Sequence, residues 1–440
     1  MERYAIKQLI DWKNKKKHKP LIIQGARQVG KTWLMQEFGK RYYEQVAYIN
    51  FDLDEKSREI FDTDYDTNRM IMDIGLATKI KINPENTLII LDEIQECPRA
   101  LTSLKYFREN APQYDIIVAG SLLGVACHEG TGFPVGKVSF MNLYPLSFEE
   151  FLLAMDEERF VELLNKRDYK TIKLFNNKYA KLLKQYCYVG GMPEVVRDFV
   201  DKKDFMSVRE LQKEILSAYE EDFTKHIPKN TVARIRLLWK SIPAQLSKEN
   251  KKFIYGAVKE GARARDFETA LSWLINSGLI YRVNKITKPD LPIIAYEDFS
   301  AFKLFVLDVG LLGAMTGLEA ETIIDGNRIF EEFKGAIAEQ YVLQQLKTIK
   351  DLQIMYWSNE TSRAEVDFVI QLKSKVIPVE VKAETNLQAK SLKVYIEKFK
   401  PNYAIRISMA DYKKTETLID LPLYCAEECT QVDALWNWTK

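Results

Sequence analysis

Short apolar runs separated by helical segments predict an α/β fold for the first third of the chain. The runs at 21–23, 46–52, 88–91 and 115–121 have the length and composition of buried strands. Four consecutive apolar residues at 88–91 are typical of a strand at the centre of a parallel sheet. The segment 32–38 after the first run has helical character. The pattern therefore predicts alternating strands and helices around a parallel sheet.

The middle of the chain changes to helical periodicity. Residues 147–205 are predicted to form helices, and Ser147 with Glu150 makes a capping box at their start. The sequence Gly190-Gly191-Met192-Pro193 breaks this helical stretch. Such a break either belongs to a lid over a nucleotide or is a plain corner between two helices.

Helices followed by a short β-ribbon are predicted for residues 206–325. A helix at 267–275, a glycine at 278 and a strand at 279–283 follow the pattern of a winged helix. Arg263 and Arg265 precede this helix and could contact nucleic-acid phosphates. Equally, a winged helix can serve as a packing module that touches no DNA.

Near the end of the chain, two alternating strands at 365–370 and 376–382 flank a polar turn and predict a β-hairpin. Glu380 and Lys382 are two residues apart on one strand, so their side chains project together, and hairpin pairing could bring Asp367 to the same patch. An acid on one strand and Glu-x-Lys on the next is the layout of PD-(D/E)XK nucleases. Asp367 and Glu380 would hold Mg²⁺, and Lys382 would stabilise charge or help to activate water. The alternative is a solvated surface hairpin, and Glu339 on the preceding helix is a further candidate acid.

Length and composition indicate a multidomain globular protein. The chain has 440 residues, 46% of them hydrophobic, and a net charge of +2 that neither favours nor excludes nucleic acid. Its five cysteines lack metal-like spacing, which suggests reduced thiols in a cytoplasmic protein. No apolar stretch is long enough to span a bilayer, so we expect no membrane partner. We expect domains at 1–145, 146–205, 206–325 and 326–440.

The segment from Gly25 to Thr32 satisfies the P-loop pattern G-x-x-x-x-G-K-[ST] between a predicted strand and a predicted helix. Its backbone N–H groups and the helix N-terminus would bind the phosphates of ATP. Lys31 would reach the β- and γ-phosphates, and the Thr32 hydroxyl would bind Mg²⁺. The predicted ATP-binding residues are Gly25, Ala26, Arg27, Gln28, Val29, Gly30, Lys31 and Thr32.

Two acids follow the predicted strand at 88–91, at the sheet edge where ligands bind in open α/β sheets. Asp92 is the predicted partner of Mg²⁺, and Glu93 is the predicted general base that polarises the attacking water. Ser121 follows another core strand, where AAA-type ATPases carry a residue that senses the γ-phosphate. Asp92 and Glu93 could also begin a helix, and Gly120-Ser121 could be an ordinary turn.

In combination, these motifs resemble bacterial and archaeal AAA-type ATPases with a C-terminal restriction-endonuclease-like domain, within the signal-transducing P-loop ATPases. The resemblance implies an ATPase core, a helical lid, a winged helix and a nuclease-like domain. An arginine finger would act on a neighbouring subunit of a homo-oligomeric ring, and Arg99 and Arg108 are candidates. The segment 124–136, rich in glycine, departs from the family pattern. The matching segments are 25–32, 88–95, 119–121, 143–151, 190–193 and 307–311, with Asp367, Glu380 and Lys382.

The predicted function is an ATP-binding and ATP-hydrolysing switch coupled to a DNA-directed nuclease-like domain. Its first alternative is a signalling ATPase whose terminal domain binds nucleic acid or protein without catalysis. A further alternative is a helicase-like loader or transposition helper, for which DNA should stimulate ATP turnover.

Overall fold

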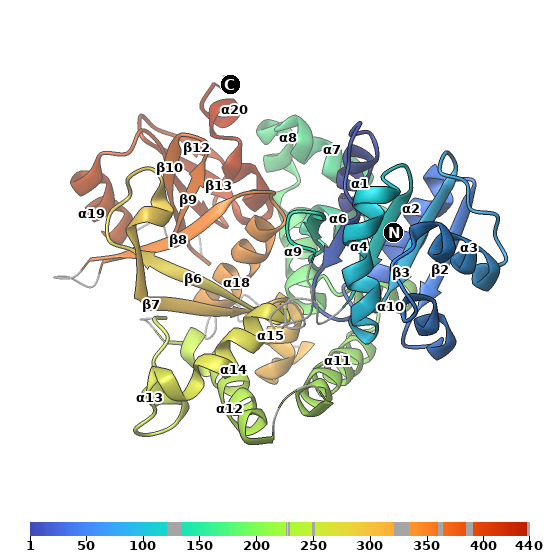
Figure 1. Cartoon of the computed structure of the whole chain (residues 1–440). Coiled ribbons are helices and arrows are strands. Elements are labelled where there is room, and N and C mark those ends of the chain that lie inside the picture. Colours follow the sequence, from blue (N-terminus) through green and yellow to red (C-terminus); the bar gives the residue numbers. More distant parts are fainter. Residues whose placement is uncertain are drawn as a thin grey trace. The chain divides into compact units, whose positions relative to one another are not determined.

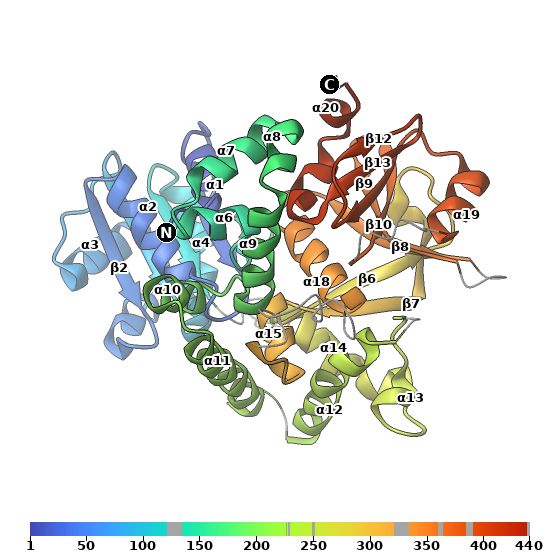
Figure 2. The same cartoon turned by 180° about the vertical axis from the view of Figure 1, so that it is seen from behind.

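The chain folds into two compact units in the computed structural model (Figures 1 and 2). The N-terminal unit holds residues 2–144 and 272–279, and the C-terminal unit holds residue 1, residues 145–271 and residues 280–440. The structure describes residues 1–120, 134–225, 227, 229–248, 251–320, 334–359, 364–383 and 390–437.

A five-stranded parallel sheet with the order β2-β3-β4-β1-β5 forms the centre of the N-terminal unit, which confirms the predicted α/β core. Strands β3 and β4 are buried over their whole length, which explains their unbroken apolar sequences. Four of the strands coincide with predicted runs, whereas β5 was not predicted. The strands are β1 (Leu21–Gln24), β2 (Gln45–Asn50), β3 (Thr87–Asp92), β4 (Asp115–Ala119) and β5 (Ser139–Asn142).

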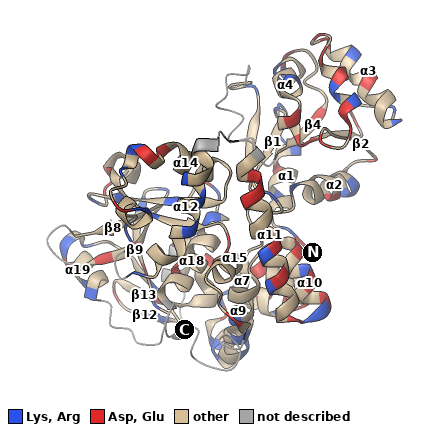
Figure 3. Ribbon diagram, turned by 90° about the horizontal axis from the view of Figure 1, so that it is seen from below, with Lys and Arg blue, Asp and Glu red and all other residues tan. Residues whose placement is uncertain are grey.

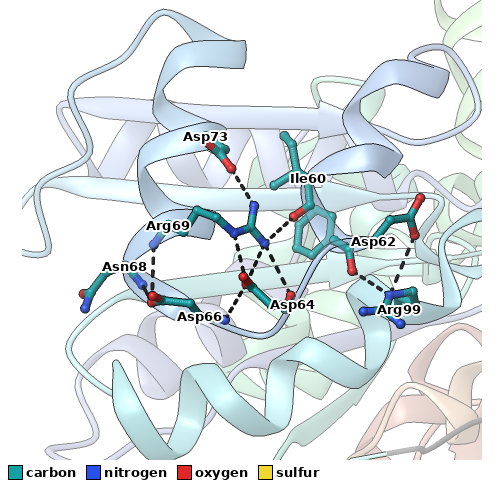
Figure 4. A network of polar contacts seen from close by, with 9 residues as sticks. Ile60, Asp62, Asp64, Asp66, Asn68, Arg69, Asp73 and Arg99 are labelled. Atoms are coloured by element: carbon teal, nitrogen blue, oxygen red, sulfur yellow. Dashed lines mark hydrogen bonds and ion pairs between the residues drawn. The ribbon is translucent and has the colours of Figure 1, made fainter.

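A polar network fixes the segment between β2 and the next long helix (Figure 4). The Arg69 guanidinium pairs with Asp64 at 2.9 Å and with Asp73 at 2.6 Å, and it donates to the Ile60 carbonyl oxygen at 3.0 Å. The Asp66 side chain accepts hydrogen bonds from two N–H groups at the start of α3 and thereby caps this helix. The helices of this unit are α1 (Ala5–Lys13), α2 (Lys31–Tyr42), η1 (Glu55–Phe61), α3 (Thr67–Thr78), η2 (Ile94–Glu96) and α4 (Pro98–Asn110).

The C-terminal unit begins with a series of helices, as the sequence predicts. The capping box of Ser147 and Glu150 is present, with reciprocal hydrogen bonds between each side chain and the other residue's backbone N–H. The series consists of α6 (Phe148–Ala154), α7 (Glu158–Lys166), α8 (Tyr169–Leu174), α9 (Asn176–Val189), α10 (Pro193–Lys202), α11 (Phe205–Lys225) and α12 (Lys229–Leu246).

The predicted break at Gly190-Gly191 is a tight corner between α9 and α10. Gly191 donates its N–H to Asp308 Oδ2 at 2.6 Å. A Cβ atom on Gly191 would lie 2.2 Å from the Leu146 carbonyl oxygen, so only glycine fits there. Asp308 also caps helix α15 (Val309–Met315) through the Leu311 N–H. The corner therefore joins three segments that are distant in sequence.

An eight-stranded mixed sheet with the order β12-β13-β11-β10-β9-β8-β6-β7 forms the rest of the C-terminal unit. The predicted hairpin is β9–β10, in antiparallel register with Ile370 opposite Ile377. Strands β6 and β7 come from the predicted winged-helix region, yet β6 pairs with β8 and extends the same sheet. The strands are β6 (Ile280–Ile286), β7 (Glu297–Val306), β8 (Gln353–Ser358), β9 (Glu365–Leu372), β10 (Lys375–Val381), β11 (Ala404–Ser408), β12 (Lys413–Lys414) and β13 (Leu418–Pro422).

Helices α18 and α19 lie on opposite sides of this sheet (Figure 1). Leu392 and Tyr395 of α19 belong to an apolar cluster with Trp357 and Val366. Because side chains alternate along a strand, Asp367 faces the other side, toward α18. The remaining helices in the described part of the chain are α13 (Tyr255–Val258), α14 (Ala264–Asn276), η3 (Ile293–Tyr296), α18 (Lys334–Lys347), α19 (Lys390–Phe399), η4 (Leu423–Thr430) and α20 (Val432–Asn437).

Candidate functional sites

The loop between β1 and α2 has the backbone conformation that a phosphate-binding loop requires. Gln28 and Gly30 have φ angles of 68° and 92°, in the left-handed region. A Cβ atom on Gly25 would lie 2.4 Å from the Leu143 carbonyl oxygen, so this position also requires glycine. Helix α2 begins at Lys31, and its first N–H groups have no partners within the helix. The loop therefore presents several N–H groups beside a helix N-terminus.

The middle residues of the loop divide into an inner and an outer pair. Ala26 and Val29 are buried, whereas Arg27 and Gln28 are exposed. Arg3, which the sequence reasoning missed, is 6% exposed and donates to the Val29 carbonyl oxygen at 3.2 Å. The sequence gives no signal that Arg3 supports the loop, because Arg3 and Val29 are far apart in sequence and meet only in the folded chain.

Lys31 is a buried cation at the end of this loop, with only 6% of its surface exposed. Its Nζ donates hydrogen bonds to the carbonyl oxygens of Gly25 and Ala26, at 2.9 and 2.8 Å. Burial lowers the pKa of Lys31 from 10.5 to about 8, although the charges of Glu93 and Asp92 oppose this change. An anionic phosphate beside the ammonium would favour its charged form, so Lys31 fits the β- and γ-phosphates of ATP.

Asp92 lies at the carboxyl end of β3, next to the loop. Its Oδ2 accepts hydrogen bonds from the Thr32 hydroxyl at 2.6 Å and from the Tyr48 hydroxyl at 3.0 Å. Burial raises the pKa of Asp92. A hydroxyl and a carboxylate in contact are the hard oxygen donors that suit Mg²⁺, so Thr32 and Asp92 fit this ion. Tyr48 was not predicted, although β2 pairs in register with β3 and places Asn50 opposite Asp92.

Glu93 directly follows β3 and has a left-handed backbone conformation, with a φ angle of 50°. Gln95 donates a hydrogen bond to Glu93 Oε2 at 2.6 Å, and the Glu93 N–H donates to Asp92 Oδ1 at 3.0 Å. An uncommon conformation for a residue other than glycine is a frequent property of active sites. Gln95 thus orients the predicted general base, a role that the sequence reasoning did not assign.

The other predicted residues of this site remain predictions. Ser121 lies outside the described residues. Arg99 donates to the Phe61 carbonyl oxygen at 2.7 Å and lies over the Tyr65 ring, and Figure 4 includes its contact with Asp62. Arg108 donates to the His18 carbonyl oxygen at 3.2 Å. Both arginine-finger candidates therefore make contacts within their own unit.

The structure brings the predicted C-terminal residues together in one buried cluster. Glu339 on α18 is 5% exposed, Asp367 on β9 is 9% exposed and Glu380 on β10 is 2% exposed. Lys382 follows β10 and pairs with Glu380 Oε1 at 2.8 Å. Asp367 Oδ2 accepts the Val381 N–H at 2.8 Å. The charged face of the hairpin is thus packed against α18 rather than solvated.

Three further residues, Lys251, Lys303 and Glu365, belong to this cluster and were not predicted as site residues. Lys303 on β7 is 0% exposed, and its Nζ lies 2.6 Å from Glu365 Oε1. The same Nζ lies 3.6 Å from Glu339 Oε2. Lys251 also pairs with Glu339. Neither lysine lies near the hairpin in sequence, so only the tertiary fold reveals their roles.

The pKa values of two carboxyl groups in the cluster are shifted in opposite directions. Burial and the charges of Glu339 and Glu380 raise the pKa of Asp367 well above its usual value. Burial acts to raise the pKa of Glu339 as well, but Lys251 and Lys303 outweigh it and lower the pKa to about 2. Burial and the neighbouring carboxylates therefore favour a protonated Asp367, whereas Lys251 and Lys303 keep Glu339 ionised.

The cluster contains both candidate metal ligands and lysines that pair with them. Its carboxylates have the right chemistry, and Glu380 Oε2 is buried without a hydrogen-bond partner. However, no group of three or more His, Cys, Asp or Glu side chains among the described residues is arranged to hold a metal ion. Metal binding by Asp367 and Glu380 remains a prediction.

Charged residues of both signs are distributed along the ribbon (Figure 3). Arg263 and Arg265, at the start of α14, are exposed, as phosphate contacts would require. DNA contact by these residues remains a prediction. Among the described residues, no helix is long and apolar enough to cross a membrane.

Comparisons with known proteins agree with the geometry of the first site. Residues 17–152 match the family described as AAA domain. Residues 180–322 and 334–425 match two families described as domains of unknown function, DUF8612 and DUF4143. No curated protein matches the chain. The fold and the loop together define a P-loop ATPase core of the AAA type.

Several solved structures are similar at low identity. The Walker-type ATPase PABY2304 of Pyrococcus abyssi is 15% identical, with a TM-score of 0.43, over 72% of this chain and 95% of that one. The ORC1 protein of Aeropyrum pernix in complex with DNA is 11% identical, with a TM-score of 0.30, over 71% and 91%. Cdc6p from Pyrobaculum aerophilum is 12% identical, with a TM-score of 0.26, over 72% and 94%.

Proposed function

We propose that the chain is an ATP-driven switch, in which hydrolysis at the P-loop changes the positions of other segments. The observation that carries this proposal is Lys31. Its ammonium is buried beside a helix N-terminus and contacts carbonyl oxygens of its own loop. The contact between Thr32 and Asp92 adds a site of matching chemistry for Mg²⁺.

The loop and the residues at the end of β3 have different roles in hydrolysis. The loop N–H groups and Lys31 hold the phosphates of ATP and stabilise the charge that develops on them. Thr32 and Asp92 would hold Mg²⁺, which neutralises phosphate charge when it is bound. Glu93, oriented by Gln95, accepts a hydrogen bond from the attacking water and polarises it.

Calorimetry with ATP and Mg²⁺ tests this assignment. We expect the intact chain to bind the nucleotide and Lys31→Ala to show no binding heat. Gln24→Ala, at the end of β1 and outside the predicted contacts, is a matched control that should retain binding. Equal affinity of the intact chain and Lys31→Ala would exclude the proposed role of the loop.

We propose that the C-terminal domain is nuclease-like and directed to DNA. The convergence of Asp367 on β9, Glu380 on β10 and Lys382 directly after β10 supports this layout. The exposed Arg263 and Arg265 offer cations for DNA phosphates. Ring assembly and a cytoplasmic location remain predictions that nothing in the described residues tests.

The C-terminal domain has two candidate functions: it either cleaves DNA or binds without cleaving. One observation favours the candidate that binds without cutting: Lys251 and Lys303 already pair with the carboxylates. A plasmid-nicking assay with Mg²⁺, comparing the intact chain with Lys382→Ala, decides between them. We expect neither protein to nick the plasmid. Nicking by the intact chain that Lys382→Ala abolishes would establish the cleaving candidate.

The trigger of the switch is tested by ATP turnover with and without duplex DNA. A DNA-directed switch or a loader should turn over ATP faster when DNA is present. A switch triggered by a protein should be indifferent to added DNA. The experiment therefore also tests the signalling alternative.

A further inference from the structure

Lys303 occupies the interior of the C-terminal carboxylate cluster. Its side chain is 0% exposed, and its Nζ lies 2.6 Å from Glu365 Oε1, 3.6 Å from Glu339 Oε2 and 3.9 Å from Asp367 Oδ1. These oxygens come from α18 and β9, whereas Lys303 comes from β7. Its ammonium is therefore surrounded by acids of two other elements, as a bound cation would be.

Three lysines compensate for most of the carboxylate charge of the cluster without an added ion. Lys251 pairs with Glu339, Lys382 pairs with Glu380 and Lys303 lies among the remaining acids. Buried carboxylates are costly unless they are paired, so these lysines supply the compensation that a metal ion would otherwise give. A divalent cation added beside Lys303 would be repelled by its ammonium.

We propose that Lys303 is the resident cation of this site and that the site binds no divalent cation while Lys303 is in place. The inference rests on the proposed nuclease-like layout of Asp367 and Glu380. It makes Lys303 the residue that determines whether the domain can use a metal. A divalent ion could bind only where Lys303 is removed or withdrawn.

The oxygens that a metal would use are already present. Glu380 Oε2 and Glu339 Oε2 are both buried and accept no hydrogen bond. In Lys303→Met, a neutral side chain of similar length would leave these oxygens and Asp367 Oδ1 without the charge of Lys303. We therefore expect this single substitution to create a site for a divalent cation.

Titration of the nucleotide-free full-length chain with Mn²⁺, followed by electron paramagnetic resonance, tests the proposal. We expect the intact chain and Asp367→Asn to bind Mn²⁺ equally, because the cluster contributes no site. Lys303→Met should gain one site, at least about tenfold tighter than any binding there in the intact chain, since one unit of repelling charge is gone. Lys303→Met/Asp367→Asn should lose it again.

Lys375→Met is the matched control, because Lys375 is an ion-paired lysine of β10 that contacts Asp433 outside the cluster. It should leave Mn²⁺ binding unchanged. A site in the intact chain that Asp367→Asn removes would overturn the proposal, as would a folded Lys303→Met that binds no more Mn²⁺ than the intact chain. If Lys303→Met does not fold, the comparison of the intact chain with Asp367→Asn still decides the matter.

Failure of this inference can be distinguished from failure of the proposed function. Mn²⁺ binding that appears only in Lys303→Met, with no nicking by either protein, would support the inference and leave cleavage without support. Mn²⁺ binding and plasmid nicking by the intact chain would overturn the inference about Lys303 and would support DNA cleavage. Neither outcome depends on ATP turnover.

Discussion

Raising the pH should stabilise the nucleotide-free protein through Lys31. Burial lowers the pKa of Lys31 from 10.5 to about 8 in the folded chain. At pH values below the folded-state pKa, Lys31 is charged in the folded and the unfolded chain, and the full cost of burying its charge destabilises the folded state. Above this pKa the folded protein releases the proton while the unfolded chain still holds it, so stability rises with pH. Between pH of about 7 and about 9.5, this linkage adds about 2 kcal/mol to the free energy of unfolding.

Urea unfolding at the two pH values measures this effect, with Lys31→Met as the matched control that lacks the titrating group. Other groups titrate in both proteins, so the difference between their pH dependences isolates Lys31. Tryptophan fluorescence is a suitable signal, because Trp12 is buried in the same unit. If the intact chain and Lys31→Met show the same dependence of stability on pH, the pKa of Lys31 is not lowered by burial in the folded protein.

Two further substitutions test the contact between Tyr48 and Asp92 and the corner between α9 and α10. Tyr48→Phe removes a hydrogen bond to Asp92 and should weaken binding of ATP with Mg²⁺ about fivefold, or about 1 kcal/mol, in calorimetry. The same loss in titrations without Mg²⁺ would contradict a role through Asp92. Gly191→Ala should destabilise the protein by about 2 kcal/mol or more, because its Cβ would lie 2.2 Å from a backbone oxygen. An unchanged melting temperature would show that the corner between α9 and α10 can adjust.

The ATPase core could be predicted because its signals are local in sequence. The spacing of Gly25, Gly30 and Lys31 specifies a loop shape, and the apolar run before Asp92 specifies a central strand. The contact between Thr32 and Asp92 then follows, since the strands of a parallel sheet all present their carboxyl ends at the same edge. Tyr48 escaped prediction because its role depends on the register of β2 against β3.

The second site could be predicted only in part. The alternation of β9 and β10 placed Asp367, Glu380 and Lys382 on one face, which the structure bears out. Lys251 and Lys303 come from segments far away in sequence, and no periodicity marks a lysine as buried. The strands β6 and β7 show the same limit. Their pattern predicted a separate wing, whereas pairing with β8 joins them to the larger sheet.

Turnover of ATP by Glu93→Gln is the most direct test of the central claim, which is that ATP is hydrolysed on this loop by a water that Glu93 polarises. We expect the variant to bind ATP and Mg²⁺ with the affinity of the intact chain and to hydrolyse ATP at least about a hundredfold more slowly. Equal turnover in the two proteins would show that Glu93 does not polarise the water, and an intact chain that binds ATP without hydrolysing it would exclude hydrolysis on this loop.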